Sequence, residues 1–336
     1  MLPRRMTALA TVAGAAALAL ACQSKQPAME ITATLSGPYL GQTPPGTEAE
    51  LFAPGLVCTG LYERDAAFTA DGTEFYYTAL LGTRATIVRI REVDGVWGRP
   101  EVAPFSGVYN DYEPFISPDG SRFFFISHRP LAPGGEIQAN SDVWVMDRVG
   151  DEWSEPRNLG EPISSAAKEY FPAVTADGTL YFTRRADDGE KLMRSELVDG
   201  VYQEPETLPR EVNGQRAQFN GFVAPDESYL IFGTLTADSG GTDYFISFRR
   251  EDGSWTPAMN MGETVNSPAG EWAPYVTRDG RYMFFHSTRG SIPAQSDPPL
   301  SYADLARMAG EPRNGQGDIY WVDASFIEDL RRAASI

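Results

Sequence analysis

The stretch that decides the fold reads DYEPFISPDG at residues 111–120 and continues as the aromatic run SRFFFISHR at residues 121–129. An Asp-Gly pair between two apolar runs is the strongest short-range signal for a β-hairpin. The same layout recurs in full at 169–178 and 271–280, and more weakly at the turns that begin with Asp71 and Asp226. The sequence therefore predicts a repeat protein built from β-hairpins.

A second mark recurs in the same phase as these turns. The turn aspartates lie 48 to 58 residues apart, and between them a turn, an aromatic residue and a proline appear together at 94–100, 150–156, 199–205 and 252–257. Proline is tolerated in an outer strand because one side of that strand has no neighbour to bond. Each unit thus reads as four strands, and β-patterned repeats of about this length are typical of propeller blades.

Five such units are present, and the fifth has no outer strand after Val322. We expect residues 51–57 to complete this last blade, so that no raw sheet edge is left. The predicted fold class is all-β: a five-bladed β-propeller of four-stranded antiparallel blades, closed by an N-terminal strand. The alternative of six blades would need a degenerate unit within residues 23–60, which is too short for four strands. Helices are expected only at 302–308 and 326–331.

The N-terminus has the layout of an export signal. Residues 1–21 hold two arginines, an Ala- and Leu-rich run too short to span a bilayer comfortably, and small residues before a cleavage point. Cys22 resembles the lipidated cysteine of a bacterial lipobox, although Ala19 and Leu20 invert the usual order; the alternative is an ordinary signal peptide cut nearby. Because Gln23 is not the aspartate that retains lipoproteins at the inner membrane, the resemblance implies an outer-membrane lipoprotein facing the periplasm or the cell surface.

The composition of the remaining chain limits its partners. Residues 22–50 are rich in Pro, Gly, Gln, Ser and Thr and read as a flexible tether, with the propeller expected over 51–336. Acidic residues outnumber basic ones by 46 to 28, whereas nucleic acid and anionic lipid surfaces both require a basic patch, so neither is expected as a partner. Cys58 is expected to be a small buried hydrophobe in a monomer that is stabilised by packing rather than by disulfides.

The Ser-Pro-Asp-Gly turn at 117–120, its aromatic strand and the following Ser-x-Arg resemble the WD40-like repeat of TolB-type β-propellers. The resemblance covers residues 51–323 and is sharpest in the second and fifth units. The segment at 38–46 also looks like a branch of bacterial exported propellers of unassigned function. The resemblance implies the fold but no activity, because propellers host scaffolds, hydrolases and lyases alike.

One position repeats an acidic or amide side chain in every unit, eight residues before the turn aspartate: Glu63, Asp111, Glu169, Gln218 and Glu271. It lies at the start of the innermost strand, so we expect these side chains to ring the mouth of the central channel, opposite the Asp-Gly turns. Like charges at such close quarters need partners. Arg129, Arg185 and Arg289 follow the second strand in three units and are expected to pair with at least two of the acids, whereas Leu80 and Leu235 replace the arginine in the other two.

Two interpretations of this ring remain open. The acids and arginines can simply pair within the structure, or they can form a binding site, which the two longest insertions, 130–141 and 290–317, would flank. The sequence lacks a Gly-x-Ser-x-Gly nucleophile motif, and its only histidines, His128 and His286, lie at different positions of their units. Two carboxylates at the mouth would still be enough for glycoside hydrolysis.

The sequence thus favours an envelope-anchored, non-catalytic binding or scaffold propeller that engages a protein or glycan at its channel mouth. The alternative is a carbohydrate-active hydrolase that uses the acidic ring. No catalytic residue, metal or cofactor is predicted, and the membrane is expected as a partner only through the lipid at Cys22.

Overall fold

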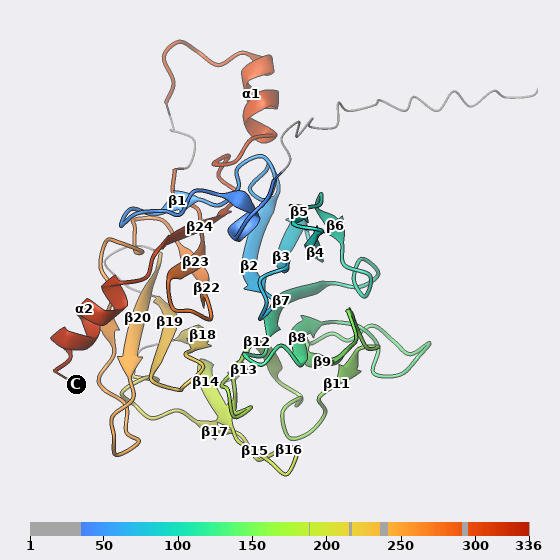
Figure 1. Cartoon of the computed structure of the whole chain (residues 1–336), viewed down its shortest axis with the longest axis vertical. Helices are drawn as coiled ribbons and strands as arrows, with labels where there is room; N and C mark the ends of the chain where they lie inside the picture. Colours follow the sequence, from blue (N-terminus) through green and yellow to red (C-terminus); the bar gives the residue numbers. More distant parts are fainter. Residues whose placement is uncertain (1–34, 188, 215–216, 236–240, 291–294, 336) are drawn as a thin grey trace, which may run out of the picture. The chain divides into compact units, whose positions relative to one another are not determined.

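A computed structural model describes residues 35–187, 189–214, 217–235, 241–290 and 295–335. These residues form a five-bladed β-propeller, in which each blade is an antiparallel sheet that runs outward from a central channel (Figure 1). The innermost strands of the blades contact one another in cyclic order, which closes the ring. The expected fold class is confirmed, and the six-bladed alternative is wrong.

From the channel outward, blade 1 contains β2 (Tyr62–Phe68), β3 (Glu74–Leu81), β4 (Arg84–Val93) and β6 (Glu101–Val102). Blade 2 contains β7 (Asp111–Ile116), β8 (Arg122–Ser127), β9 (Asp142–Val149) and β11 (Arg157–Asn158). Blade 3 contains β12 (Lys168–Val174), β13 (Leu180–Ala186), β14 (Gly189–Ser195) and β17 (Glu206–Thr207). Blade 4 contains β18 (Gln218–Val223), β19 (Tyr229–Leu235), β20 (Thr242–Phe248) and β21 (Met259–Asn260). Blade 5 contains β22 (Glu271–Val276), β23 (Tyr282–Ser287), β24 (Asp318–Asp323) and β1 (Glu50–Leu51). Short hairpin strands follow the third strands of blades 1 to 3: β5 (Val96–Trp97), β10 (Glu152–Trp153), β15 (Leu197–Val198) and β16 (Val201–Tyr202).

The Asp-Gly turns are held by the aspartate side chain itself. In blade 3, Asp177 accepts hydrogen bonds from Thr175 Oγ1 at 2.5 Å and from the Thr179 N–H at 3.1 Å. These bonds, chiefly the one from Thr175, lower the pKa of Asp177 and keep it ionised. Gly178 follows with a φ of 89°, a left-handed conformation that costs glycine little. The aspartate of the Asp-Gly pair therefore favours the hairpin because its carboxylate accepts hydrogen bonds from residues of its own turn.

The N-terminal strand closes the fifth blade, as expected, but it is shorter than residues 51–57. Strand β1 pairs with β24 through Glu50 opposite Trp321 and Leu51 opposite Tyr320, and the Phe52 N–H donates to Ile319 O at 2.9 Å. The chain then turns, because Ala53 has a φ of 45° and its carbonyl accepts from the Val57 N–H. The next residue, Cys58, is fully buried, and its thiol donates to Ile319 O at 3.2 Å.

The segment expected to be a flexible tether is packed against the propeller over residues 35–50. Its short 3₁₀ turn η1 (Tyr39–Gly41) buries Leu40 completely, and the Tyr39 ring lies 5.0 Å from the ring of Tyr282 in blade 5. In blade 1, the Trp97 indole N–H donates to Gly37 O at 2.8 Å. Packing of aromatic side chains therefore orders this polar stretch. The rest of the expected tether, Cys22 and the expected signal peptide lie outside the described residues.

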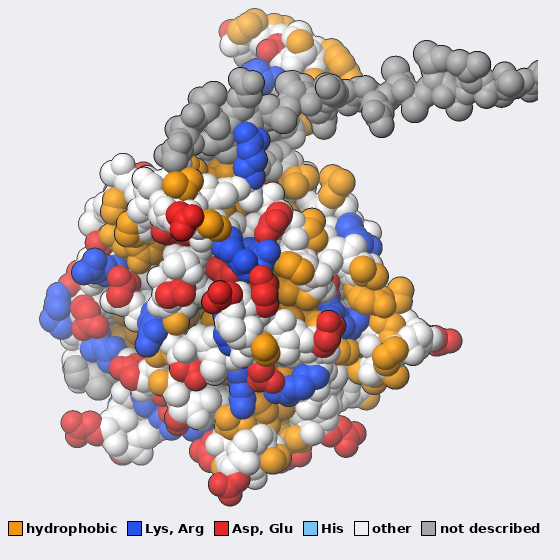
Figure 2. Space-filling model, turned by 45° about the vertical axis from the view of Figure 1, so that its right-hand side comes forward, with side chains coloured by type: hydrophobic (Ala, Val, Ile, Leu, Met, Phe, Trp, Pro, Cys, Tyr) orange, Lys and Arg blue, Asp and Glu red, His pale blue; other side chains and the backbone are white. Residues whose placement is uncertain are grey.

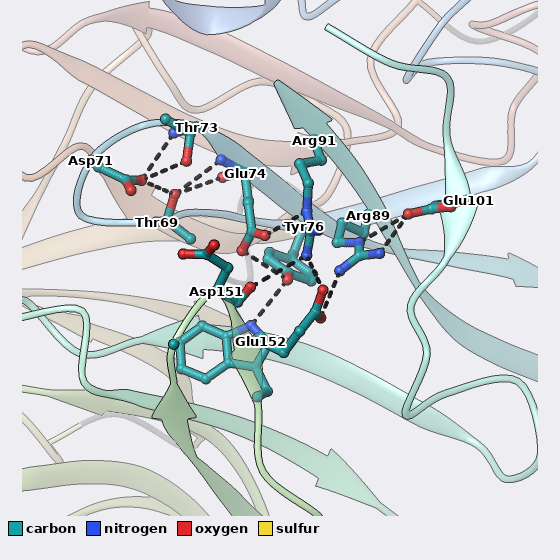
Figure 3. A network of polar contacts seen from close by, with 12 residues as sticks. Thr69, Asp71, Thr73, Glu74, Tyr76, Arg89, Arg91, Glu101, Asp151 and Glu152 are labelled. Carbon is teal, nitrogen blue, oxygen red and sulfur yellow. Dashed lines mark hydrogen bonds and ion pairs between the residues drawn. The ribbon is translucent and has the colours of Figure 1, made fainter. Parts of the chain in front are cut away.

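A polar network joins the outer parts of blades 1 and 2 (Figure 3). Glu74 on β3 is buried and lies 2.9 Å from Arg91 Nε and 3.0 Å from Arg148 Nη1, and the Tyr76 hydroxyl donates to it at 3.0 Å. Glu152 on β10 in turn pairs with Arg91 at 3.0 Å. A buried carboxylate is stable only when it is paired and hydrogen-bonded, so this network fixes the two blades against each other.

Two helices form where the sequence predicts them. Helix α1 (Tyr302–Ala309) lies in the insertion between β23 and β24, and helix α2 (Phe326–Ala333) follows β24 (Figure 1). A capping box begins α1: Ser301 Oγ accepts from the Asp304 N–H, and the Asp304 carboxylate accepts from the Ser301 N–H. None of the helices within the described ranges is long and apolar enough to cross a membrane.

Candidate functional site

A β-bulge interrupts the innermost strand of every blade at the same place. The pairing with the second strand shifts register there, and the residue two positions after the repeated acidic or amide side chain has a left-handed φ between 53° and 63° in all five blades: Asp65, Glu113, Phe171, Asn220 and Ala273. None of these is glycine, so each bulge is strained and must be held by its surroundings. Bulges re-aim side chains, and here they decide which residues face the channel.

The five predicted ring residues do not face the channel. Glu63, Asp111, Glu169, Gln218 and Glu271 are buried, with at most 1% of their surface exposed. The position expected for them, around the mouth, is corrected: they lie within the blades, because the side chains that follow them in the strand line the channel instead.

Three of the four acids pair with arginines, as expected for at least two. Asp111 lies 2.9 Å from Arg129 Nη2 and accepts from Ser127 Oγ at 2.6 Å. Glu271 has the equivalent contacts in blade 5, at 3.2 Å from Arg289 Nη2 and 3.0 Å from Ser287 Oγ. Since β8 and β23 end at these serines, each arginine can fold back over its own blade.

Blade 3 uses a different arginine from the one expected. Glu169 pairs with Arg184 Nε at 2.8 Å, whereas Arg185 lies 3.6 Å from Glu190 and is largely exposed. The reason is strand length. Strand β13 continues in regular pairing to Ala186, where Glu169 lies opposite Arg184, and the alternation of side chains turns Arg185 away.

Blades 1 and 4 have no arginine at this position and keep unpaired atoms. Glu63 accepts from Thr59 Oγ1 and from the Thr59 N–H, but its Oε2 atom has no partner among the described residues. Burial raises the pKa of Glu63 to about 7, against the lowering effect of the Thr59 bonds. In blade 4, Nε2 of Gln218 likewise lacks a partner within the part of the chain described.

The mouth of the channel holds a cavity of about 530 Å³. It is lined by the residue that follows the predicted ring position in every blade: Arg64, Tyr112, Tyr170, Phe219 and Trp272. Sequence reasoning missed these five residues, although the signal was present, since this position is aromatic in four of the five units. Four aromatic side chains and one guanidinium therefore surround the cavity, and we call these five residues the aromatic wall.

Charged groups at the base of the cavity are paired with one another. Arg64 Nε lies 2.7 Å from Asp65 Oδ1, and Arg64 Nη2 lies 3.1 Å from Glu113 Oε1. The Phe171 N–H donates to Glu113 Oε2 at 2.7 Å. Burial raises the pKa of Glu113 above the usual range of a carboxyl group, although the Arg64 guanidinium opposes this rise.

Other polar side chains reach the cavity from the blades on either side. Lys168 lies with its Nζ 5.5 Å from the centre of the Tyr170 ring, and Glu190 is also a lining residue. His128 Nε2 is 3.1 Å from the Tyr112 hydroxyl, while His128 Nδ1 lies 3.1 Å from Gln138 O in the 130–141 insertion. Asn220 is 4% exposed, lines the cavity, and its Nδ2 has no partner among the described residues.

The surroundings of the site are of mixed character. The two insertions, in their described parts, supply no lining residue to the cavity. No three metal-ligating side chains come together within the described ranges. On the face drawn in Figure 2, acidic and basic side chains are interspersed, so neither sign dominates it.

No protein family model and no curated protein matches the sequence. The fold is similar to that of a putative TolB from Agrobacterium tumefaciens, with 15% identity, a TM-score of 0.46, and coverage of 77% of this chain and 89% of that one. TolB from Acinetobacter baumannii gives 13% identity and a TM-score of 0.44 over 78% of this chain and 57% of that one. The catalytic domain of an alpha-L-arabinofuranosidase from Coprinopsis cinerea gives 10% identity and a TM-score of 0.47 over 83% and 97%. At these identities the likenesses concern the fold alone.

Proposed function

We propose that this protein is a non-catalytic binding propeller that holds a saccharide unit of an envelope glycan in its channel-mouth cavity. The observation that carries the proposal is the aromatic wall of this cavity. Tyr112, Tyr170, Phe219 and Trp272 approach one cavity from four successive blades, with polar groups between them. Binding sites are mostly apolar with a few placed polar groups, and a sugar ring offers both an apolar face to stack and hydroxyl groups to bond.

The buried acids support this site from behind. Asp111, Glu169 and Glu271 hold the start of the innermost strand in blades 2, 3 and 5 through arginine and hydroxyl contacts, at the residue just before the aromatic one. The predicted acidic residues are thus proposed to position the aromatic wall rather than to touch the ligand. Rigid support of this kind lowers the entropic cost of binding.

The test measures binding of neutral oligosaccharides to the mature chain by tryptophan fluorescence and by calorimetry. Trp272→Ala should weaken binding at least tenfold, because it removes one stacking face. Tyr302→Ala on α1, which removes an exposed aromatic side chain away from the cavity, is the matched control and should bind normally. Normal binding by Trp272→Ala and by Tyr112→Ala would contradict the proposal, and capture of a protein instead of a sugar would replace it.

A glycoside hydrolase is the second candidate, and one observation favours it. Glu113, whose pKa is raised by burial, shares the cavity with a second carboxylate, Glu190. A proton donor and a second carboxylate are the groups that glycoside hydrolysis requires. If the protein is this enzyme, Glu113→Gln should abolish turnover of an aryl glycoside while sugar binding survives. Equal sugar release by Glu113→Gln and the parent would exclude it.

The envelope location rests on the N-terminal sequence, and we propose that a lipid on Cys22 anchors the propeller in the outer membrane. Cys22→Ala should move the protein from the membrane fraction to the soluble periplasm. Accessibility of the propeller to protease in intact cells would then distinguish a surface-exposed from a periplasmic orientation.

A further inference from the structure

Blade 4 departs most from the repeat. It has Gln218 where the other blades have an acid, and Leu235 where three units carry an arginine. Three buried side-chain atoms of this blade have no hydrogen-bond partner among the described residues: Gln218 Nε2, Asn220 Nδ2 and Tyr244 Oη. Of these three residues, Asn220 is the one that lines the mouth cavity.

Hydrogen bonds link the bulges of neighbouring blades, up to Asn220. The bulge N–H of Glu113 donates to Asp65 Oδ2 at 3.2 Å, and that of Phe171 donates to Glu113 Oε2 at 2.7 Å. Phe171 has no side-chain acceptor to offer in turn. The Asn220 N–H donates to Thr183 Oγ1 at 3.1 Å, as the Glu113 N–H also donates to Thr78 Oγ1 at 3.1 Å. The backbone of Asn220 is thus anchored, while its buried Nδ2 has no acceptor among the described residues.

We propose that Asn220 determines ligand specificity, donating from Nδ2 to an oxygen of a neutral saccharide unit that stacks on the neighbouring Phe219 and Trp272. This inference rests on the proposed function and adds the place and the chemical class of the ligand. A buried donor without a partner is costly, and a site built to hydrogen-bond a ligand oxygen rejects analogues that lack it. Asn220 thus combines two unfavourable features, a buried Nδ2 without a partner among the described residues and a left-handed φ of 53°.

The charges of the cavity specify that the saccharide is neutral. Arg64 and Lys168 line it together with Glu113 and Glu190, two cations and two carboxyl groups. Arg64 is already paired with Glu113 and with Asp65 behind it, and Glu190 lies 3.6 Å from Arg185. The lining thus carries as many carboxyl groups as cations, so it offers an anionic sugar no excess of positive charge, and stacking and single hydrogen bonds are left to select the ligand.

The decisive variant is Asn220→Asp, which keeps the shape of the side chain and replaces the donor with an acceptor. Asn110→Asp is the matched control, because Asn110 also lines the cavity but uses its amide oxygen to accept from the Ala85 N–H at 3.1 Å, a bond that aspartate preserves. Each variant adds one negative charge to the same cavity. Affinities are measured with cellotriose, chitotriose and, as an anionic probe, a trigalacturonate.

Asn220→Asp should weaken binding of the neutral probe at least tenfold, whereas Asn110→Asp should weaken it less than threefold. Asn220→Gly should also lose affinity but melt at a higher temperature than the parent, because it removes both the unpaired donor and the side-chain strain at positive φ. This pairing of lost affinity with a raised melting temperature would not arise from a merely structural role.

The outcomes separate the two levels of the argument. If Trp272→Ala loses binding while Asn220→Asp and Asn220→Gly retain it, the specificity inference is overturned and the proposed function stands. If the trigalacturonate binds more tightly than both neutral probes, the neutral class is wrong. If the parent binds no saccharide at all, the proposed function falls and the inference falls with it.

Discussion

Blades 1 and 5 lie next to each other where the ring closes, yet they treat the same buried carboxyl group differently. Glu271 in blade 5 is bonded by Ser267, Ser287 and Arg289. Glu63 in blade 1 has no arginine beside it, accepts hydrogen bonds from Thr59, and keeps one oxygen without a partner in the described part of the chain. The repeated fold therefore does not require that the buried acid be paired with an arginine in every blade.

The difference follows from the end of the second strand. Strand β23 stops at Ser287, and the next residues turn so that the guanidinium of Arg289 returns to Glu271 and lies 4.9 Å from the centre of the Phe285 ring. Strand β3 continues to Leu81, and Leu80 occupies the arginine position. Desolvation of Glu63 is then opposed only by hydrogen bonds, and its pKa rises to about 7.

The largest expected effect comes from giving blade 2 the arrangement of blade 1. Arg129→Leu leaves the carboxylate of Asp111 buried without its cation, which should lower the free energy of unfolding by about 3–5 kcal/mol. Urea unfolding followed by tryptophan fluorescence measures this. Arg185→Leu is the control, because Arg185 is exposed and its contact with Glu190 is loose, and it should cost less than about 0.5 kcal/mol. Equal losses in the two variants would mean that the buried pairing does not stabilise the blade.

A smaller effect, with a defined pH dependence, is expected from Glu63→Gln. The pKa of Glu63 is higher in the folded state, about 7, than in the unfolded chain. Its favourable contribution is therefore complete below about pH 4.5 and is lost as the pH rises to 7, by about 3 kcal/mol at 1.36 kcal/mol per pKa unit. The parent should thus lose stability relative to Glu63→Gln over this range, as measured by unfolding at a series of pH values.

The same substitution in blade 5 should destabilise the protein, because Glu271→Gln leaves the guanidinium of Arg289 without its carboxylate. Burial raises the pKa of Glu271 as it does that of Glu63, although Ser267 and Arg289 oppose the rise, so the parent should again lose stability relative to the variant as the pH rises. A net stabilisation at pH 8 by Glu271→Gln as large as that by Glu63→Gln would show that the blades are equivalent in spite of their different contacts.

The smallest effect is expected for a single hydroxyl group. Ser267→Ala removes the 2.5 Å hydrogen bond to Glu271 and should cost about 1.5–3 kcal/mol, the range for a hydrogen bond to a charged group. Ser254→Ala, which removes an exposed bond to Asp252, should change the melting temperature little. A loss at Ser254 as large as that at Ser267 would argue against a special role for the buried acid.

Much of the fold could be predicted because its signals are local. The Asp-Gly turns, the aromatic second strands and the proline-marked outer strands recur in the sequence, and five units with one missing strand predicted closure by the N-terminus. The pairing of Asp111 with Arg129 and of Glu271 with Arg289 was predicted in the same way, since both members of each pair flank the same hairpin.

The sequence predicted a ring of acidic and amide side chains at the channel mouth, whereas the structure buries these residues and lines the cavity with the residue that follows each of them. Regular alternation places either Asp111 or Tyr112 toward the channel, and the sequence does not say which. The bulge at Glu113 and the packing of five blades decide it, because an acid can be buried only where serine and arginine side chains from neighbouring strands meet it. The choice of Arg184 over Arg185 depends in the same way on how far β13 extends.

By itself, the sequence determined the number of blades, the place of each turn and the origin of the closing strand, since short-range patterning sets all three. Only the tertiary structure decided that residues 35–50 pack on the propeller, that the acids are enclosed and that the aromatic wall faces the cavity. These outcomes depend on contacts between residues far apart in the chain, such as Tyr39 with Tyr282 and Phe171 with Glu113, and no local pattern encodes them.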